Sequence, residues 1–294
     1  MTFSIIVVCL NAGSRLRDTV ESIRRQTEED YEIIVKDGVS EEKTTTDYLD
    51  QLEREGEADS RIRVYRQEKD SGIYDAMNQA VKYCRGDYIF FLNCGDCFYD
   101  DQVLAKVREQ IECFEKGRKA ALKNGQKKNA ADLTGADGKI SRIFYGNIRE
   151  RLTGTMVQSN PVIDDFACYR NLPCHQACFY AAELLDKRAF DTGYRVRADY
   201  EHFLWCRYRG GAETVYMPVT VALYEGGGFS ETRENKRRSK QEHSKITAKY
   251  MSGAQILRYR MIMLLTLAPL RTWIAGNPAT AGIYQAIKKR LYKV

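Results

Sequence analysis

The sequence lacks the two glycine-rich signatures by which many proteins hold phosphate. The first apolar stretch, Ile5 to Leu10, is followed by Asn11-Ala12-Gly13 rather than by Gly-x-Gly-x-x-Gly, and no Walker loop occurs. Dinucleotide redox chemistry and P-loop phosphoryl transfer are therefore not expected. If the protein binds phosphate, a divalent cation held by carboxylate oxygens is the expected means.

The sequence also has no apolar run of the ~20 residues that a membrane-spanning helix needs. Its most apolar segment, 261–270, is bounded by Arg260 and Arg271. No charged region followed by a cleavable apolar segment precedes Ile5, so secretion is not expected. The cysteines number nine and follow no repeating framework, which indicates free thiols in a reducing cytoplasm.

Two cysteine spacings suggest zinc only superficially. Cys94-x-x-Cys97 and Cys174-x-x-x-Cys178 each lack a matching second pair, whereas structural zinc usually has four ligands in recognisable pairs. We expect these thiols to pack rather than to bind metal.

Acidic residues are absent after Glu242, although the net charge of the whole chain is only +6. Trp273 and the surrounding cations suit a helix that lies in a lipid interface. The alternative is a helix that packs on the rest of the protein and leaves a basic face in solvent. We expect contact with anionic lipid, and no nucleic-acid binding, because no groove-reading or aromatic motif accompanies the basic residues.

Short apolar stretches alternate with segments of helical periodicity along the first hundred residues. The stretches are Ile5 to Leu10, Tyr31 to Val35, Ile62 to Arg66 and Tyr88 to Leu92. This alternation predicts an α/β fold with a doubly wound, mostly parallel sheet flanked by helices. A polar cluster follows each stretch, and ligands bind beyond the carboxyl ends of such strands, so we expect these clusters to gather along one edge as a site.

Seven segments, in order, carry a resemblance to a known family. They are Ser4 to Asn11, Ile33 to Ser40, Asp70 to Asn78, Gly86 to Asp96, Tyr145 to Asn147, His175-Gln176 and Ala198 to Glu201. Through these segments the chain resembles the non-processive family 2 glycosyltransferases of bacterial surface-polysaccharide assembly, whose catalytic domain has the GT-A fold. Each segment is weak evidence alone, and their common order and spacing make the resemblance specific.

The resemblance implies a catalytic domain over residues 1–225. A nucleotide-sugar half would occupy 1–100 and an acceptor half 140–225, with 115–139 as a mobile insertion because it is rich in Lys, Ala, Asn and Gly without periodicity. Residues 226–294 would form a glycine hinge and a basic helical C-terminal extension that is a candidate for membrane contact.

The resemblance also implies a donor site. Asp37 would accept a hydrogen bond from a uracil or similar base, which Val8 and Leu10 would frame, although an Asp before Gly is also a typical turn residue. Asp75 and Asn78 would line the donor, although an Asp in a first helical turn is also favoured by the helix dipole. The expected donor set is Val8, Leu10, Asn11, Asp37, Gly38, Asp70, Gly72, Asp75, Asn78, Asn93, Cys94, Gly95 and Asp96.

Asp96 corresponds to the last carboxylate of the Asp-x-Asp type of motif in this family. It is the expected ligand of Mg²⁺ or Mn²⁺, which would bridge the donor diphosphate and neutralise charge on the leaving group. The sequence departs from the commoner pattern because Asn93 and Gly95 stand where acids are often found. The other metal ligands therefore stay unassigned.

Asp199 is the expected catalytic base, placed by resemblance at a helix start beneath the acceptor hydroxyl. The alternative is a carboxylate that only favours the helix N-terminus. His175 and Gln176 are expected to line the acceptor side, although a single His is often a structural residue.

The sequence therefore predicts an inverting hexosyl- or N-acetylhexosaminyltransferase. Its donor would be a nucleotide diphosphate sugar, with UDP favoured over guanine and thymine nucleotides, and its acceptor a saccharide or polyprenyl-linked saccharide. A cytoplasmic location, peripheral at the inner face of the cell membrane, would suit that acceptor. Two alternatives stay open: a sugar nucleotidyltransferase, and a nucleotide-sugar-binding scaffold with a decayed motif.

Overall fold

The computed structural model describes residues 1–123, 140–226 and 232–266. The chain divides into two compact units, Met1–His243 and Ser244–Val294. The first unit contains a nine-stranded sheet with flanking helices, and the second contains helix only among the residues that are described.

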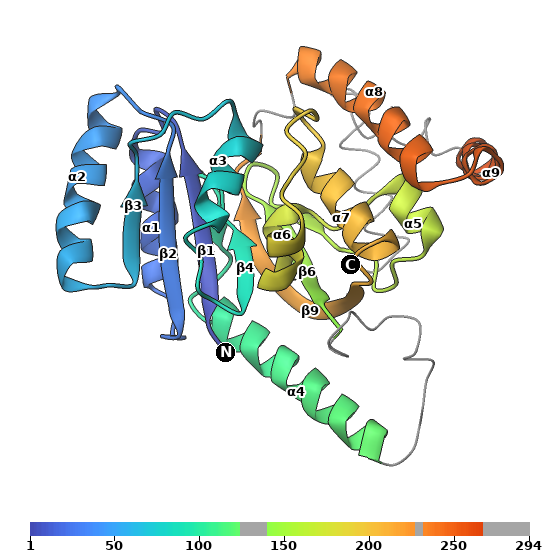
Figure 1. Cartoon of the computed structure of the whole chain (residues 1–294), viewed down its shortest axis with the longest axis horizontal. Coiled ribbons are helices and arrows are strands. Elements are labelled where there is room, and N and C mark those ends of the chain that lie inside the picture. Colours follow the sequence, from blue (N-terminus) through green and yellow to red (C-terminus); the bar gives the residue numbers. More distant parts are fainter. Residues whose placement is uncertain (124–139, 227–231, 267–294) are drawn as a thin grey trace. The chain divides into compact units, whose positions relative to one another are not determined.

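The N-terminal half of the sheet is parallel and has the order β3-β2-β1-β4 (Figure 1). These strands are β1 (Phe3–Cys9), β2 (Tyr31–Asp37), β3 (Ile62–Tyr65) and β4 (Tyr88–Phe91). In this register Ile5 pairs with Ile33 on one side and with Phe90 on the other. The apolar runs form strands here because β1 and β2 are buried on both faces. The predicted α/β class and its four N-terminal strands are confirmed.

Helices cover both faces of this half, with α1 behind the sheet and α3 in front of it in Figure 1. They are α1 (Ser14–Arg24), α2 (Lys43–Ala58), α3 (Ile73–Val81) and α4 (Val103–Lys123). α1, α2 and α4 share one core with Ile5, Val7 and Ile33. α4 continues to Lys123, so the first part of the expected insertion 115–139 is helical. The residues after Phe114 form no apolar stripe, but Lys, Arg and Ala favour helix individually. The remainder of that insertion lies outside the described residues.

The C-terminal half of the sheet is mixed and continues in the order β4-β8-β6-β9-β5. β8 pairs antiparallel with β4 and β6, whereas β6 and β9 are parallel. The strands are β5 (Cys97–Phe98), β6 (Arg142–Glu150), β7 (Met156–Val157), β8 (Cys178–Ala181) and β9 (Glu213–Tyr224), and the helices are α5 (Asp165–Arg170), η2 (His175–Ala177), α6 (Ala182–Lys187) and α7 (Ala198–Tyr208).

Two further helices follow, α8 (Arg233–Tyr250) and α9 (Gly253–Leu265). α9 begins with a capping box, in which the side chains of Ser252 and Gln255 each bond the backbone of the other. Of the expected hinge Gly226-Gly227-Gly228, only Gly226 is described, and the tail beyond residue 266 also lies outside the described residues. Within the described ranges no helix combines the length and apolarity needed to cross a membrane.

Candidate active site

The carboxyl ends of β1 and β2 bring the first polar clusters together, as the sequence predicted. Asn11 has a φ of 48°, and its side-chain oxygen accepts hydrogen bonds from the backbone N–H groups of Glu41 and Glu42. The Gly38 N–H donates to the carbonyl of Cys9 over 2.9 Å. A Cβ on Gly38 would lie 2.5 Å from a carboxylate oxygen of Asp70, so a larger residue here would displace the Asp70 side chain.

Asp37 is buried at the end of β2, and its carboxylate is occupied by the turn that follows. It accepts hydrogen bonds from the Ser40 N–H over 2.8 Å and from the Ser40 hydroxyl over 2.5 Å. Val8 is buried within β1, whereas Leu10 is 57% exposed beside it. The structure thus gives Asp37 a turn-stabilising role, and its contact with a nucleotide base stays a prediction.

Lys36 is a buried residue that the sequence analysis did not single out. Its ammonium donates to the carbonyls of Asp37 over 2.6 Å and Glu68 over 2.7 Å, and lies 4.0 Å from the Asp70 carboxylate. A buried cation must be paired or hydrogen-bonded, so Lys36 fixes the end of β2 to the loop before α3. The available signal was a lysine that directly follows the apolar run Ile33 to Val35.

The start of α3 holds three predicted donor residues. Gly72 precedes the helix with a φ of 141°. Asp75 accepts hydrogen bonds from the N–H and the hydroxyl of Ser71, and the backbone bond is the main cause that lowers the pKa of Asp75. Asn78 both donates to and accepts from the backbone of Phe190, each over 2.9 Å. Asp75 and Asn78 therefore make structural contacts, and their predicted roles toward a donor stay predictions.

The turn after β4 carries the proposed metal ligand. Gly95 has a φ of 99°, and Asp96 is only 4% exposed. One Asp96 oxygen accepts from the Gln176 amide over 3.0 Å, and the other accepts from the Glu225 N–H over 2.9 Å. Burial raises the pKa of Asp96 above its ordinary value despite these hydrogen bonds. Cys94, in the same turn, is partly buried with its thiol against Cys9.

Glu225 brings a second carboxylate to this turn, which the sequence analysis missed. A Cβ on Gly95 would collide with the Glu225 carboxylate, whose side chain is 39% exposed and lies 3.6 Å from the Arg15 guanidinium. In the described part of the chain, no three or more His, Cys, Asp or Glu side chains form a metal-binding group. Two carboxylates at one turn suit a hard cation that takes its remaining ligands from a bound diphosphate and water, rather than one held by protein alone.

Asp199 lies in the first turn of α7, as predicted, and its side chain is 27% exposed. The Tyr74 hydroxyl lies 2.8 Å from one carboxylate oxygen, and His175 Nδ1 lies 3.3 Å from the other. Burial acts to raise the pKa of Asp199, but the hydrogen bonds from His175 and Tyr74 outweigh it and the pKa falls below its ordinary value. The carboxylate is therefore ionised at neutral pH.

His175 and Gln176 connect the two carboxylates of the site. His175 contacts Asp199 through Nδ1, and its Nε2 lies 2.9 Å from the amide nitrogen of Asn93. Gln176, the next residue, donates to Asp96. The structure brings five of the expected site residues into contact: Asn93, Asp96, His175, Gln176 and Asp199. Asp37 and Asp75 make their hydrogen bonds elsewhere along the sheet edge. The predicted roles of all seven stay predictions.

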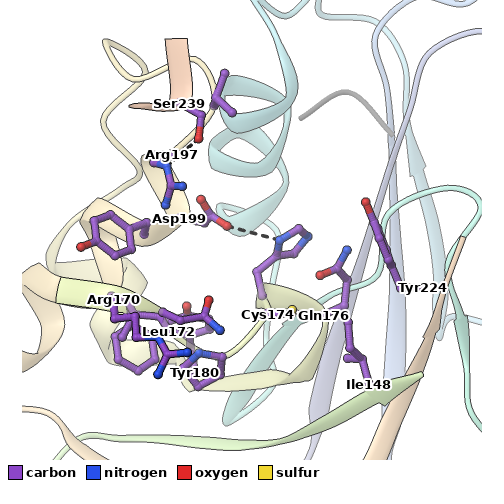
Figure 2. A pocket seen from close by; sticks show the side chains of 16 residues that line it. Ile148, Arg170, Leu172, Cys174, Gln176, Tyr180, Arg197, Asp199, Tyr224 and Ser239 are labelled. Carbon is purple, nitrogen blue, oxygen red and sulfur yellow. Dashed lines mark hydrogen bonds and ion pairs between the residues drawn. The ribbon is translucent and has the colours of Figure 1, made fainter. Parts of the chain in front are cut away.

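A cavity of about 430 Å³ opens beside this pair (Figure 2), with Asp199 and Gln176 pointing into it. Arg170 and Arg197 also line it, and the Arg197 guanidinium donates to the Ser239 hydroxyl over 2.7 Å. Within the described residues, neither guanidinium forms an ion pair. The cavity thus combines a carboxylate, an imidazole and two cations, which suits the binding and deprotonation of a polar ligand.

Comparisons with known proteins bear on the family and the fold of this chain. The model of Glycosyl transferase family 2 matches residues 4–123. A relative in Mycobacterium tuberculosis, described as a PGL/p-HBAD biosynthesis glycosyltransferase, is 31% identical over 232 residues, which cover 78% of this chain and 79% of that protein.

Two solved structures share the fold. TarS 1–349 of S. aureus in complex with UDP has a TM-score of 0.59 at 14% identity and covers 87% of this chain and 68% of its own. The mannosyltransferase PcManGT of Pyrobaculum calidifontis, in complex with GDP-Man and Mn²⁺, has a TM-score of 0.55 at 16% identity and covers 99% and 80%.

Proposed function

The chain belongs to glycosyl transferase family 2, and from this membership we propose that it transfers a sugar with inversion from a nucleotide diphosphate donor to an acceptor hydroxyl. The observation that carries the proposal is the pair His175-Gln176, which joins Asp96 on the donor side to Asp199 on the acceptor side. A glycosyl transfer needs those two sites a short distance apart, because the acceptor oxygen must reach the anomeric carbon of the bound donor.

In the proposed reaction the acceptor oxygen attacks the anomeric carbon from the face opposite the diphosphate. The bond to the diphosphate oxygen breaks, and the nucleoside diphosphate leaves with the electron pair. The acceptor O–H bond breaks and its proton passes to the carboxylate of Asp199, which is ionised, partly exposed and directed into the cavity. This single displacement inverts the configuration at the anomeric carbon.

Asp96 and Glu225 are the residues that would hold Mg²⁺ or Mn²⁺. When bound, the cation would supply positive charge against the diphosphate as it leaves. The burial of Asp96 supports this role, because a buried carboxylate with a raised pKa gains most from a cation. The complex of PcManGT with Mn²⁺ is consistent with such a site.

A UDP-sugar is the donor that we favour, with a hexosyl or N-acetylhexosaminyl group to be transferred. The UDP complex of TarS supports uracil as the nucleobase of the donor. The GDP-Man complex of PcManGT leaves guanine as the alternative nucleobase. The alternative of a binding scaffold rests on Asn93 and Gly95 in place of acids, but the ordered contacts of Asp199 and His175 argue against decay.

We propose a saccharide or polyprenyl-linked saccharide as acceptor, reached by peripheral attachment to the cytoplasmic face of the cell membrane. The support lies in α9, where Leu257, Met261, Leu264 and Leu265 recur at helical spacing and are 49–78% exposed. An exposed apolar stripe beside Arg258 and Arg260 suits the interface of an anionic bilayer.

The proposed donor site is tested by thermal stabilisation of the full chain with UDP, GDP, dTDP and CMP, with and without Mn²⁺. We expect a Mn²⁺-dependent rise in Tm with one diphosphate in wild type, and no such rise in Asp96→Ala. Stabilisation by none of the four nucleotides would contradict the proposal. Release of inorganic diphosphate from a sugar 1-phosphate and a nucleoside triphosphate would instead indicate a nucleotidyltransferase.

The membrane proposal is tested by flotation of the full chain with vesicles that contain phosphatidylglycerol. The combined changes Leu257→Gln, Met261→Gln and Leu264→Gln should reduce the bound fraction several-fold, because they remove the apolar stripe. Leu152→Gln, at a leucine that is 74% exposed in the first unit, serves as the control and should leave binding unchanged. Equal binding by the triple variant and wild type would contradict attachment through α9.

A further inference from the structure

The cavity beside Asp199 contains two cations that the proposed transfer does not use. Arg170, the last residue of α5, and Arg197, the residue directly before α7, both line it. Among the described residues that form the cavity wall, Asp199 is the only carboxylate, so the guanidinium groups outnumber it. A concave surface with an excess of positive charge attracts anions. The charge of this cavity therefore bears on what the acceptor carries.

A buried carboxylate, Glu242 of α8, lies against the segment that contains Arg197. Its oxygens accept hydrogen bonds over 2.9–3.0 Å from three consecutive backbone N–H groups, those of Arg195, Val196 and Arg197. Backbone donors of this kind stabilise a buried carboxylate without a cation. Glu242 thus fixes the backbone that leads to Asp199, and the side chain of Arg197 is left to serve the cavity.

Neutral groups hold the Arg197 side chain in place. The guanidinium donates to the Ser239 hydroxyl over 2.7 Å, and its Cζ lies 5.3 Å from the centre of the Tyr200 ring. In Figure 2 it lies above the Asp199 side chain. A guanidinium has five N–H donors, so these contacts leave both its charge and most of its donors available to a ligand. Arg197 is therefore positioned in advance for a charged group.

We propose that the acceptor carries an oxyanion, either a phosphate ester or a carboxylate, which Arg197 and Arg170 bind while the reacting hydroxyl lies at Asp199. The inference rests on the proposed glycosyl transfer and assigns the charge of its acceptor, which that proposal leaves open. Only Ala198 separates Arg197 from Asp199, so their Cα atoms are at most about 7.6 Å apart. One small acceptor unit can therefore contact both side chains.

The chemistry of the cavity wall favours a charged sugar over a neutral one. The planar fork of a guanidinium meets two oxygens of a phosphate or carboxylate at once, and such charge-assisted bonds are roughly twice as strong as neutral ones. A neutral sugar offers only hydroxyl and ether oxygens, which would leave the charge of a desolvated guanidinium uncompensated. Aromatic side chains supply the apolar part of the wall, which suits the carbon skeleton of a sugar; they are Tyr180, Tyr200, Phe203 and Tyr224.

The two arginines differ in exposure and therefore in expected contribution. Arg197 is partly buried, whereas Arg170 is exposed at the end of α5. A partly buried cation interacts more strongly with a bound anion, because solvent and salt screen an exposed one. Arg197 thus supplies most of the affinity for the oxyanion, and Arg170 adds a smaller share from the open side of the cavity.

The first test is a ligand-observed NMR titration of the full chain with UDP and Mg²⁺ present to fill the donor site. The probes are glucose 1-phosphate, methyl glucuronide and methyl glucoside, which carry a phosphate, a carboxylate and no charge. Wild type should bind at least one anionic probe about 10–100-fold more tightly than methyl glucoside. The tighter of the two anionic probes identifies the oxyanion. Equal Kd values for all three probes, or no binding of either anionic probe, would overturn the proposal.

The second test repeats the titration with variants of the two arginines. Arg197→Gln should weaken the anionic probe about 10–100-fold and leave methyl glucoside unchanged. Arg197→Lys, which keeps the charge but not the fork, should lose less, and Arg170→Gln should also lose less because Arg170 is exposed. Undiminished affinity of Arg197→Gln for the anionic probe, or an equal loss for methyl glucoside, would contradict the assignment.

Arg17→Gln is the matched control. Arg17 also has neutral partners, since it donates to Gln51 over 3.1 Å and its Cζ lies 4.1 Å from the centre of the Tyr48 ring, but it belongs to α1 and does not line the cavity. Its loss should leave all three Kd values unchanged. Retention of the Tm rise with UDP and Mg²⁺ reports that each variant is folded. If Arg197→Gln loses that rise, Arg197→Lys and Arg170→Gln decide the question.

Failure of this inference is distinguishable from failure of glycosyl transfer. If wild type neither binds UDP nor releases it from UDP-glucose or UDP-GlcNAc, the proposed function fails, and titration of the nucleotide-free protein still decides whether the cavity binds an oxyanion. If wild type binds UDP but prefers neither anionic probe, glycosyl transfer stands and the acceptor is neutral at this position.

Discussion

Gln176 donates a 3.0 Å hydrogen bond to Asp96, although the two residues are 80 positions apart in the chain. The bond joins η2, which precedes β8, to the turn after β4, and β4 and β8 are neighbours in the sheet. Because the backbone of η2 also carries His175, a displacement of the metal-binding turn would shift the imidazole as well. The proposed metal-binding turn and the imidazole that contacts Asp199 are therefore linked through η2.

The variant Asp96→Asn should distinguish the effect of Asp96 on folding stability from its effect on metal binding. Burial raises the pKa of Asp96, so the folded state binds this proton more tightly than the unfolded state. The contribution of Asp96 to stability is thus most favourable at acidic pH and declines as pH rises through its folded pKa. Wild type should lose stability relative to Asp96→Asn between about pH 4 and neutrality in metal-free urea unfolding.

Mn²⁺ with UDP should then stabilise wild type at neutral pH but not Asp96→Asn. A pH-independent difference between the two proteins would show that burial does not perturb this carboxylate.

Asp199→Asn should keep donor binding and lose turnover. The amide of asparagine cannot accept the proton of the acceptor hydroxyl, so kcat should fall by roughly 10²–10⁴-fold. The thermal shift with UDP and Mn²⁺ should stay within error of wild type, since Asp199 contacts α3 and η2 rather than the donor turn. Near-normal UDP release by the variant would remove Asp199 from the mechanism.

Glu225→Gln tests the second carboxylate at the metal turn. The substitution keeps the backbone N–H that bonds Asp96 and removes only a charge. We expect the Mn²⁺ concentration for half-maximal stabilisation by UDP to rise about tenfold, the size of effect typical of outer metal-site partners. Glu183→Gln, far along the chain and bonded to Ser141, is a matched control. Identical Mn²⁺ titrations of wild type and Glu225→Gln would exclude Glu225 from the site.

The burial of His202 predicts that the folded protein loses stability at acidic pH. Burial lowers the pKa of His202 from 6.5 to about 4, and its Nε2 bonds the carbonyl of Arg188 over 2.8 Å. As pH falls from 6.5 toward 4, the unfolded chain takes up a proton that the folded chain refuses, so stability should fall by about 3 kcal/mol. His202→Gln should flatten this dependence in urea unfolding between pH 7 and 4. An unchanged slope would point to other groups.

The parallel half of the fold was predictable because its strands are buried on both faces and therefore appear as continuous apolar runs. β8 and α5 were missed, since a four-residue strand and a six-residue helix carry too little periodicity to be recognised without their tertiary partners. α4 extends past Phe114 through residues that favour helix individually but form no apolar stripe.

The site was predictable in its composition and less so in its contacts. Resemblance placed Asp96, His175 and Asp199 together, but no pattern in the sequence shows that one imidazole contacts both Asp199 and Asn93. Glu225 and Lys36 were missed because their roles depend on which loop meets which strand end. Resemblance assigned Asn78 to the donor, a role that stays a prediction, and no pattern in the sequence shows that its amide bonds the backbone of Phe190.

That contact of Asn78 has a consequence for how substrates enter. The amide of Asn78 and the peptide groups of Phe190 form a reciprocal pair of 2.9 Å bonds, in the manner of one rung of an antiparallel ladder. It fastens α3, which carries Tyr74, to the chain between α6 and α7, which leads to Asp199. These two hydrogen bonds hold α3 and the segment before α7 together. We therefore expect ligands to enter the proposed site through local loop movement rather than through a hinge motion that separates α3 from α7.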